Sequence, residues 1–382
     1  MARLIYILAG EHSGDALGAR LISALRARSP EVGFVGVGGP RMIAEGLTSL
    51  FPMQDLAMMG LLEVVPNLRR LRRRLAEATA DIAARGPDAV VTIDSPDFML
   101  RLLKAIEPLG IPRAHYVAPQ VWAWRERRVR HFRGRWDRLL CLLPFEPEFF
   151  AKHGLSARFV GHPVLESGAD RGDAGQFRAR HALPPEARVV VLMPGSRSTE
   201  VRQLLPVYGK TLELLQDRVP NLKPVLPVAP AVATDVRRAV ANWAIVPLII
   251  SDVEEKHDAF AATAAALTKS GTSTLELALA NVPMAVAYRV GWLNAAAARR
   301  LIQVRHVAMV NLLAGKQLVP ELLQERCTPE KLADALEELL ARQDLAESQL
   351  RGFKDVLAGL RPAEGAPSAA AAEAVLELLH EA

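Results

Sequence analysis

Short apolar runs that recur along the chain constrain its fold more than any other feature of the sequence. They begin at Leu4, Phe34, Ala89, Ala114 and Leu139, and then at Val189, Val225, Val246, Ala265 and Val282. Each run is rich in Val, Ile, Leu or Ala without strict alternation, ends near Gly, Pro or Asp, and is separated from the next by a helical stretch. Strands of parallel sheets are buried on both faces and are joined by crossover helices, which produces this pattern. The sequence therefore predicts an α/β protein with two Rossmann-like, doubly wound parallel-sheet domains.

The length of 382 residues also favours two domains, because single cores stop growing near ~250–300 residues. A Gly- and Asp-rich segment at 159–175 is the expected linker. We predict an N-terminal domain at 1–165, a second domain at 166–345, and C-terminal helices at 346–382 that pack back on the first domain. Ligands of such sheets bind beyond the carboxyl ends of the strands, so we expect the active site in the cleft between the domains.

The apolar runs and the spacing of the cysteines together predict the cellular compartment of the protein. The first run stops at a Gly-rich loop rather than a cleavage site, so we interpret it as a strand and not a signal peptide. No stretch of ~18 apolar residues predicts a spanning helix. Cys141 and Cys327 lie far apart, and no His, Asp or Glu cluster has metal-ligand spacing. We expect a reduced, cytoplasmic protein that needs no metal or other cofactor.

Positive charge is concentrated in the first half. Residues 1–165 hold 23 Lys and Arg against 16 Asp and Glu, which suits a negatively charged partner. Within it, the segment 58–75 combines an apolar series with five arginines and predicts docking on an anionic bilayer. The predicted docking residues are Leu61, Leu62, Val64, Val65, Leu68, Arg69, Arg70, Leu71, Arg72 and Arg73. The alternative is a core-facing helix with a solvated basic side.

Two loops of the first half follow predicted strands. The loop from Ala9 to Asp15 is Gly-rich and opens a helix, which suits a ligand or a tight turn capped by Ser13 or Asp15. The second loop carries Asp94 and Asp97 around a proline, and one of these carboxylates is a candidate for acid–base catalysis. The alternative is that one of them caps a helix.

Two loops of the second half suit phosphate. Arg197 follows a Gly-Ser turn at Gly195 and Ser196, and guanidinium binds phosphate bidentately. The segment 270–278 has a Gly- and hydroxyl-rich turn before a helix, where exposed amides attract anions. One turn into that helix, Glu276 is placed to accept hydrogen bonds from a ribose diol. The segment 270–278 is not a Walker A motif, and the alternative for the Arg197 turn is a helix start capped by Ser196.

A basic, aromatic stretch follows the fourth run. Trp122 and Trp124 precede seven arginines between Arg125 and Arg138. Aromatic rings interleaved with arginines can bind single-stranded nucleic acid. The alternative is a basic segment whose tryptophans pack inward. No nucleic-acid-binding motif accompanies it, so we expect no nucleic acid partner.

Several of these motifs, taken in order, resemble the lipid-A-disaccharide synthase family. They are AGEHSGD, VGVGGPRM, TIDSPDF, YVAPQVWAWR, LLPFEPEFF, FVGHPVLE, MPGSRSTEV and SGTSTLELAL. The resemblance implies a GT-B glycosyltransferase of lipid A (lipopolysaccharide) biosynthesis in Gram-negative bacteria. It implies inverting transfer from UDP-2,3-diacylglucosamine to 2,3-diacylglucosamine 1-phosphate, giving a β(1→6) disaccharide 1-phosphate and UDP. The implied location is peripheral, at the cytoplasmic face of the inner membrane, and a homodimer is left open.

The resemblance also implies roles for single residues. Asp97 is the leading candidate for the general base, with Asp94, Glu11 and Asp15 as alternatives, and Arg197 and Asn311 are associated with activity. The implied UDP-binding residues are Gly195, Ser196, Arg197, Gly271, Thr272, Ser273 and Glu276. The expected acceptor-binding residues are Gly10, Glu11, Ser13, Gly14 and Asp15.

The chain departs from the family pattern in two places. Val310 stands where we expect a proline, and the stretch 224–257 matches poorly, so its uracil contacts are not transferable. Another GT-B enzyme, such as a UDP-GlcNAc 2-epimerase or a soluble sugar transferase, is the alternative function. It has no need for the apolar and basic segment at 58–75. Acyl-chain length is not readable from the sequence.

Overall fold

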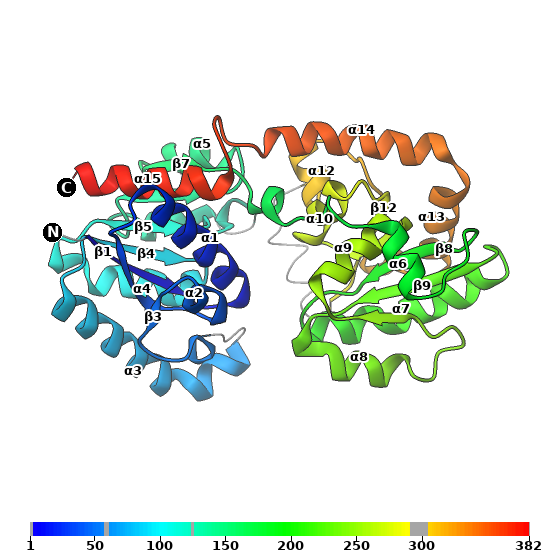
Figure 1. Ribbon diagram of the computed structural model, residues 1–382, viewed down its shortest axis with the longest axis horizontal. Coiled ribbons are helices and arrows are strands. Elements are labelled where there is room, and N and C mark those ends of the chain that lie inside the picture. Colours follow the sequence, from blue (N-terminus) through cyan, green and yellow to red (C-terminus); the bar gives the residue numbers. More distant parts are fainter. Residues whose placement is uncertain (1–2, 57–60, 124–125, 291–304, 382) are drawn as a thin grey trace. The chain divides into compact units, whose positions relative to one another are not determined.

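The computed structural model describes residues 3–56, 61–123, 126–290 and 305–381, with side chains of 61–67 and 381 left out (Figure 1). The chain divides into two compact units. Unit 1 comprises Met1–Pro163 and Leu360–Ala382, and unit 2 comprises Val164–Gly359. The boundary falls inside the Gly- and Asp-rich segment expected as the linker, and each unit has its own apolar core.

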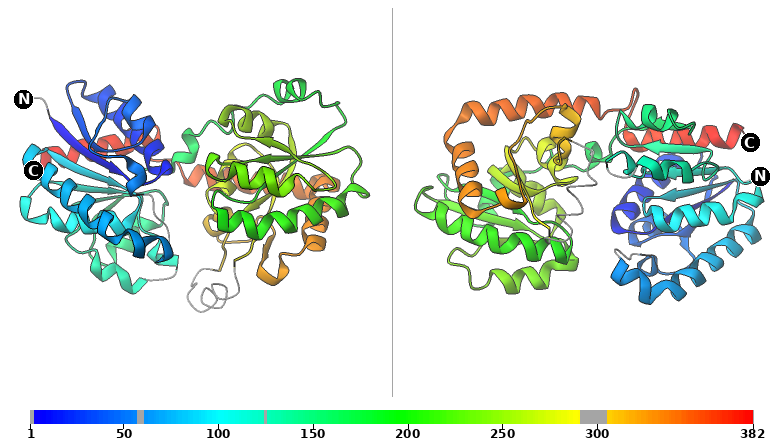
Figure 2. Two further views of the ribbon diagram at one scale, coloured as in Figure 1. Left: turned by 90° about the horizontal axis from the view of Figure 1, so that it is seen from below. Right: turned by 180° about the vertical axis from the view of Figure 1, so that it is seen from behind.

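Unit 1 is built on a parallel sheet of seven strands in the order β3-β2-β1-β4-β5-β6-β7. The strands are β1 (Leu4–Ala9), β2 (Gly33–Val37), β3 (Thr48–Ser49), β4 (Ala89–Ile93), β5 (Arg113–Tyr116), β6 (Arg138–Cys141) and β7 (Ala157–Phe159). Its helices are α1 (His12–Arg28), α2 (Pro40–Ala44), α3 (Leu61–Arg85), α4 (Pro96–Ala105), α5 (Glu146–Ala151) and α15 (Pro367–Glu381). Helix α1 packs beside α15, and α3 packs beside α4 (Figures 1 and 2).

Unit 2 repeats this design with six parallel strands in the order β10-β9-β8-β11-β12-β13. The strands are β8 (Arg188–Met193), β9 (Leu222–Pro227), β10 (Leu248–Ile250), β11 (Thr263–Lys269), β12 (Met284–Tyr288) and β13 (Glu321–Leu323). The helices are α6 (Ala174–Arg180), α7 (Ser198–Gln216), α8 (Ala233–Val240), α9 (Val253–Ala261), α10 (Ser273–Leu279), α12 (Met309–Ala314), α13 (Pro329–Ala341) and α14 (Gln343–Gly359). Helix α7 packs against α8 and α13, and α10 packs against α12 and α14.

Short 3-10 helices complete the connections. They are η1 (Met53–Asp55), η2 (Glu107–Leu109), η3 (Val121–Ala123), η4 (Glu126–His131), η5 (Pro163–Glu166), η6 (Pro230–Val232) and η7 (Gln324–Arg326). Across the described ranges, no helix combines the length and the hydropathy that crossing a bilayer requires.

The predicted α/β class with two parallel-sheet domains is confirmed. The predicted packing of 346–382 needs a correction, because only the last part of this segment belongs to unit 1. Helix α14 packs on α10, α12 and α13 of unit 2, and a leucine from unit 2, Leu318, fills the space beside Gly352. The chain joins unit 1 at Leu360. Helix α15 then buries Ala371, Ala374 and Val375 in the core of unit 1.

Candidate active site

The topology of each sheet brings two predicted loops together. In unit 1 the chain leaves β1 for β2 on one side, while β4 pairs with β1 on the other. Unit 2 has the same reversal between β8 and β11. Open α/β sheets bind ligands outside the carboxyl ends of strands at this reversal. The loops at Gly10 and Asp94 therefore meet in unit 1, and those at Gly195 and Ser270 meet in unit 2.

The two unit 1 loops touch directly. A Cβ atom on Gly10 would lie 2.5 Å from the Ser95 hydroxyl, so only glycine fits there without displacement. The Ser95 hydroxyl is buried and has no hydrogen-bond partner among the described residues. Backbone strain accompanies this contact, because Asp94, Ser95 and Val117 have φ values of 52°, 45° and 80°. Non-glycine residues in this region cost free energy and cluster at functional sites.

Asp97 lies in the first turn of α4, directly after this strained loop. Its side chain is 87 % exposed, and Arg128 approaches Oδ1 at 3.2 Å. Asp94 is less exposed, and its amide donates to the Tyr116 carbonyl at 2.9 Å. Asp97 is thus the more accessible carboxylate of the pair.

Asp15, predicted to bind acceptor, has a different task in the structure. It is 2 % exposed, and its carboxylate accepts hydrogen bonds from the amides of Gly39, Arg41 and Met42 at 2.9, 3.1 and 3.0 Å. These bonds satisfy amides at the start of α2, where helices leave donors unpaired. We therefore assign Asp15 to the fold rather than to the acceptor site.

Gly14 also serves packing, since a Cβ there would meet that of Ala9 at 3.2 Å. Glycine at this position lets α1 approach β1 closely. Of the other predicted acceptor residues, Ser13 is exposed in the first turn of α1 and Glu11 is half-buried beside it. Acceptor binding by Gly10, Glu11 and Ser13 stays a prediction.

The unit 2 loops form a charged cluster. Glu200 Oε1 lies 2.8 Å from Lys269 Nζ and 3.5 Å from Arg197 Nη1. Gly195 has φ of 114°, and a Cβ on it would collide with the Glu200 carboxylate. Tyr288, at the end of the neighbouring β12, joins the cluster: burial and the Glu200 charge raise the pKa of its phenol, while Arg197 lowers it. Three adjacent strands therefore deliver these side chains to one edge.

The turn before α10 is held by its own hydroxyl groups. Ser273 Oγ donates to the Lys269 carbonyl at 3.0 Å, and Thr274 Oγ1 donates to the Gly271 carbonyl at 2.8 Å. Gly271 adopts φ of 145°, a backbone conformation that favours glycine. Ser270 and Thr272 flank it. These bonds fix the turn that was predicted to hold phosphate, and UDP binding there stays a prediction.

Glu276, predicted to bind a ribose diol, is paired within the protein. Both of its carboxylate oxygens accept hydrogen bonds from Lys256 Nζ of α9, at 3.2 and 3.3 Å. Lys256 also lies over the Phe260 ring, 5.6 Å from its centroid. The carboxylate is therefore held in one orientation, half-buried beside the turn.

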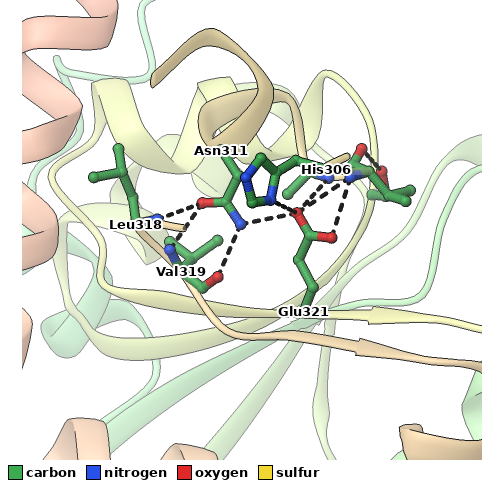
Figure 3. Close-up of polar contacts among 8 residues, drawn as sticks. His306, Asn311, Leu318, Val319 and Glu321 are labelled. Carbon is green, nitrogen blue, oxygen red and sulfur yellow. Dashed lines mark hydrogen bonds and ion pairs between the residues drawn. The ribbon is translucent and has the colours of Figure 1, made fainter. Parts of the chain in front are cut away.

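Asn311, predicted to be catalytic, is completely buried. Figure 3 shows the hydrogen bonds of its side-chain amide. Its Nδ2 donates to the Val319 carbonyl at 2.9 Å and to Glu321 Oε1 at 2.8 Å. Its Oδ1 accepts from the amides of Leu318 and Val319 at 2.7 and 2.9 Å. Every polar atom of the amide is engaged in hydrogen bonds within the fold, which suits a positioning residue, and a role of Asn311 in activity stays a prediction.

The same network reaches the predicted phosphate turn. Glu321 accepts hydrogen bonds from the amides of Val307 and Ala308. Ser270 Oγ, in the turn, donates to the Val307 carbonyl at 2.6 Å. Asn311 therefore supports the turn through Glu321 and the backbone at 307–308.

The structure separates the faces of α3, the predicted docking helix. Leu71 and Leu75 pack against the core of unit 1, so Leu71 is not free to enter a bilayer. Arg74 binds Asp55 at 2.6 Å and stacks over Phe51, and Arg70 lies 3.8 Å from Asp55. Exposed on the other side are Arg69, Arg72 and Arg73, with Leu68 half-buried. The side chains of Leu61, Leu62, Val64 and Val65 lie outside the described residues.

The aromatic rings near the arginine stretch face inward. Trp122 Nε1 donates to Glu146 Oε1 at 3.1 Å, and Phe132 and Trp136 are buried. Glu146 also accepts from the amides of Leu142 and Leu143, and burial raises its pKa to about 7. Phe132 and Trp136 pack in the core of unit 1, as the alternative interpretation of the stretch predicts, and Trp122 is half-buried. Trp124 and Arg125 lie outside the described residues.

Comparison with known proteins decides the family. The family model of lipid-A-disaccharide synthetase matches residues 5–375 of the chain. A lipid-A-disaccharide synthase of Gluconobacter oxydans is 60 % identical over 379 residues, covering 99 % of this chain and 91 % of the relative. The chain belongs to the lipid-A-disaccharide synthase family. Its members from Granulibacter bethesdensis and Pseudomonas aeruginosa are 58 % and 43 % identical, with 99 % and 98 % of each chain covered. As a member of this family, the chain is a glycosyltransferase.

Solved structures confirm the GT-B fold of this synthase family member. A Staphylococcus aureus MnaA–UDP structure superposes with a TM-score of 0.65 at 13 % identity, covering 98 % of this chain and 95 % of that one. The calicheamicin glycosyltransferase CalG4 gives 0.60 at 16 % identity, covering 100 % and 98 %. These likenesses establish the architecture alone.

Four residues of this chain lie beside predicted site residues but are not part of the motifs that predicted the site. They are Lys256, Lys269, Tyr288 and Glu321. Lys256 binds Glu276, Glu321 binds Asn311, and the Arg197 charge acts on the Tyr288 phenol. The Lys269 carbonyl accepts a hydrogen bond from Ser273, and its ammonium group binds Glu200 beside Arg197. Lys269 stood directly before the predicted phosphate turn, which was a usable signal. The other three lie outside the quoted motifs. In the described parts of the chain, no group of three or more His, Cys, Asp and Glu is arranged to hold a metal ion.

Proposed function

We propose that the chain transfers 2,3-diacylglucosamine from UDP-2,3-diacylglucosamine to the 6-hydroxyl of 2,3-diacylglucosamine 1-phosphate. The products are the β(1→6) disaccharide 1-phosphate and UDP. Membership of the lipid-A-disaccharide synthase family supports this reaction. The observation that carries it is the cluster of Arg197, Lys269 and the Gly271 turn at the carboxyl ends of β8 and β11. This is where a doubly wound sheet binds a nucleotide.

Asp97 is proposed as the general base. Its exposure and its place in the first turn of α4 support this choice over Asp15, which is buried and bonded to three amides. Its carboxylate accepts the proton of the acceptor 6-hydroxyl as that oxygen attacks the anomeric carbon. One displacement on the face opposite the α-linked UDP gives the β product.

The leaving group is UDP, whose diphosphate gains negative charge as the glycosidic bond breaks. Arg197 and the amides at Gly271, Thr272 and Ser273 are proposed to stabilise that charge. Preorganised donors aimed at developing charge are commonly the largest contribution to catalysis. The proposal assigns this task to the protein's own groups and requires no cofactor.

The proposal extends to the membrane. Both substrates carry acyl chains, and α3 presents Arg69, Arg72 and Arg73 on its exposed side. Arginines near an anionic bilayer attract it by about 1 kcal/mol each. We propose that unit 1 docks peripherally on the inner face of the inner membrane and takes the lipid acceptor there, while unit 2 holds UDP.

UDP release in the presence of each lipid separately and of both together tests the reaction. We expect release and disaccharide formation only with both. Release independent of the acceptor, or release without disaccharide, would contradict the proposed transfer and favour another GT-B activity.

Asp97→Asn tests the base. Losing a general base typically lowers turnover 10²–10⁴-fold, and we expect a loss of that order with unchanged UDP affinity. Glu31→Gln, at an exposed position before β2, is the matched control and should keep full turnover. Full turnover of Asp97→Asn would move the role to Asp94 or Glu11.

A further inference from the structure

Lys269 is a cation beside the predicted phosphate turn, at a position that the quoted sequence motifs do not include. It is the last residue of β11 and directly precedes the Ser270–Gly271 turn. Its side chain is 21 % exposed, so its ammonium group is neither freely solvated nor sealed in the core. A Cβ placed on Gly271 would lie 3.9 Å from Nζ, which puts the ammonium at the edge of the space that glycine keeps open.

Glu200 holds Lys269 and Arg197 side by side. One oxygen of its carboxylate, Oε1, contacts both cations. Glu200 is 16 % exposed and lies in the first turn of α7, against Gly195, where any larger residue would collide with it. Glycine at position 195 therefore leaves the space that the Glu200 side chain occupies beside the two cations.

These three side chains together carry one positive charge in excess. An ammonium group has three donors and a guanidinium has five, and the contacts to Glu200 use one nitrogen of each. No other described residue takes up the remaining donors, which leaves them to a ligand as far as the described parts of the chain extend. A site with surplus cationic donors at the reversal between β8 and β11 suits a group with more than one negative charge.

We propose that Lys269 is a second cationic ligand of the donor's diphosphate, beside Arg197, and that Glu200 is the residue that positions both. This inference rests on the proposed function. It adds that the affinity for UDP depends on the Lys269 charge, whereas the affinity for the nucleoside part does not.

Titration calorimetry of the full chain with UDP and with uridine tests the inference. Lys269→Met keeps the length of the side chain and removes its charge. We expect the UDP dissociation constant to rise about tenfold to hundredfold, as for other lost charge-assisted hydrogen bonds. Uridine binding should stay unchanged, and the salt dependence of UDP binding should become shallower. Lys223→Met, an exposed lysine of β9, is the matched control and should change neither.

Two further variants separate binding from folding. Lys269→Met leaves Glu200 without its closest partner, so the double variant Lys269→Met/Glu200→Gln removes both charges. We expect its thermal stability to return toward that of the native chain while UDP affinity stays low. Lys269→Arg restores a cation and should recover most of the affinity.

The outcomes are distinct. Native chain that binds no UDP would overturn the proposed function and this inference together. Native chain that binds UDP while Lys269→Met binds it equally well would overturn only the role of Lys269. Equal losses for UDP and uridine would assign Lys269 to the structure of the unit and likewise overturn its role as a diphosphate ligand.

Discussion

Asn311 lies in a buried hydrogen-bond network that reaches the predicted phosphate turn. Its amide joins Leu318 and Val319 to Glu321, which holds the backbone at 307–308. That backbone accepts a hydrogen bond from Ser270 in the predicted phosphate turn. Loss of Asn311 therefore reaches the turn through a chain of buried hydrogen bonds, which are costly to leave unmade.

Asn311→Ala should lower the free energy of unfolding by ~2–4 kcal/mol, because buried donors and acceptors lose their partners. Denaturant unfolding measures this change. UDP affinity should fall in the same variant at temperatures where it is folded. Gln317→Ala is the matched control, since Gln317 is exposed in the same connection, and it should change stability by at most ~0.5 kcal/mol. A stable Asn311→Ala protein that binds UDP normally but turns over poorly would return Asn311 to a catalytic role.

Residues whose function follows from local sequence were easier to predict than residues whose function depends on a distant partner. Gly195 and Gly271 lie in motifs, and the backbone conformations observed there explain why glycine is needed. The pairing of Lys269 with Glu200 depends on β8 and β11 being neighbours, and no local pattern encodes it. Asp15 has the residue type of a ligand group, and only the position of α2 shows its structural role.

Helix α3 shows the same limit at the scale of an element. The sequence predicts an amphipathic segment but does not say which apolar residues meet the core. The structure places Leu71 and Leu75 against the core and leaves Arg69, Arg72 and Arg73 exposed. Among the described side chains of α3, charge rather than apolar surface is what supports the proposed docking.

Replacing Arg69, Arg72 and Arg73 with Ser should weaken binding to anionic vesicles. Each of the three charges contributes about 1 kcal/mol to the free energy of membrane binding. Together they correspond to about two orders of magnitude in the membrane partition coefficient. Sedimentation with phosphatidylglycerol-containing vesicles measures this effect. The matched control replaces three exposed arginines of unit 2 together, Arg202, Arg237 and Arg238. Equal losses in both variants would show attraction by net charge, with no dedicated docking helix.

Strands were predictable where their sequence is continuously apolar. All ten apolar runs correspond to strands of the two sheets. The strands that the runs missed are β3, β7 and β13, each of two or three residues and each at a sheet edge. An edge strand is paired on one side only, so its sequence need not be continuously apolar.

At the scale of the whole molecule, the path of the last helices was the least predictable feature. Helix α14 remains with unit 2, and the chain then returns to unit 1 through α15 (Figure 1). Arg138 and Arg158 bind Glu377 of α15, and Glu373 lies 3.7 Å from Arg158. Both helices are amphipathic, and their sequences do not specify which unit they cover.

This return allows the two units to be perturbed separately. Val375 is completely buried in the core of unit 1, although it lies near the end of the chain. Val375→Asp places an unpaired charge there and should lower the stability of unit 1 by ~3–5 kcal/mol. Unit 2 keeps its own core and the proposed UDP site, so we expect a lower first unfolding transition with nearly native UDP affinity. Acceptor-dependent turnover should fall as unit 1 unfolds.

Calorimetric unfolding with and without UDP distinguishes the units, because a ligand raises the transition of the unit that binds it. UDP should raise the second transition of Val375→Asp and leave the first unchanged. Glu373→Gln, on the exposed face of the same helix, should behave as the native chain within ~0.5 kcal/mol. If Val375→Asp lost UDP affinity in parallel with acceptor turnover, the nucleotide site would depend on unit 1, and its assignment to the β8–β11 edge would have to be abandoned.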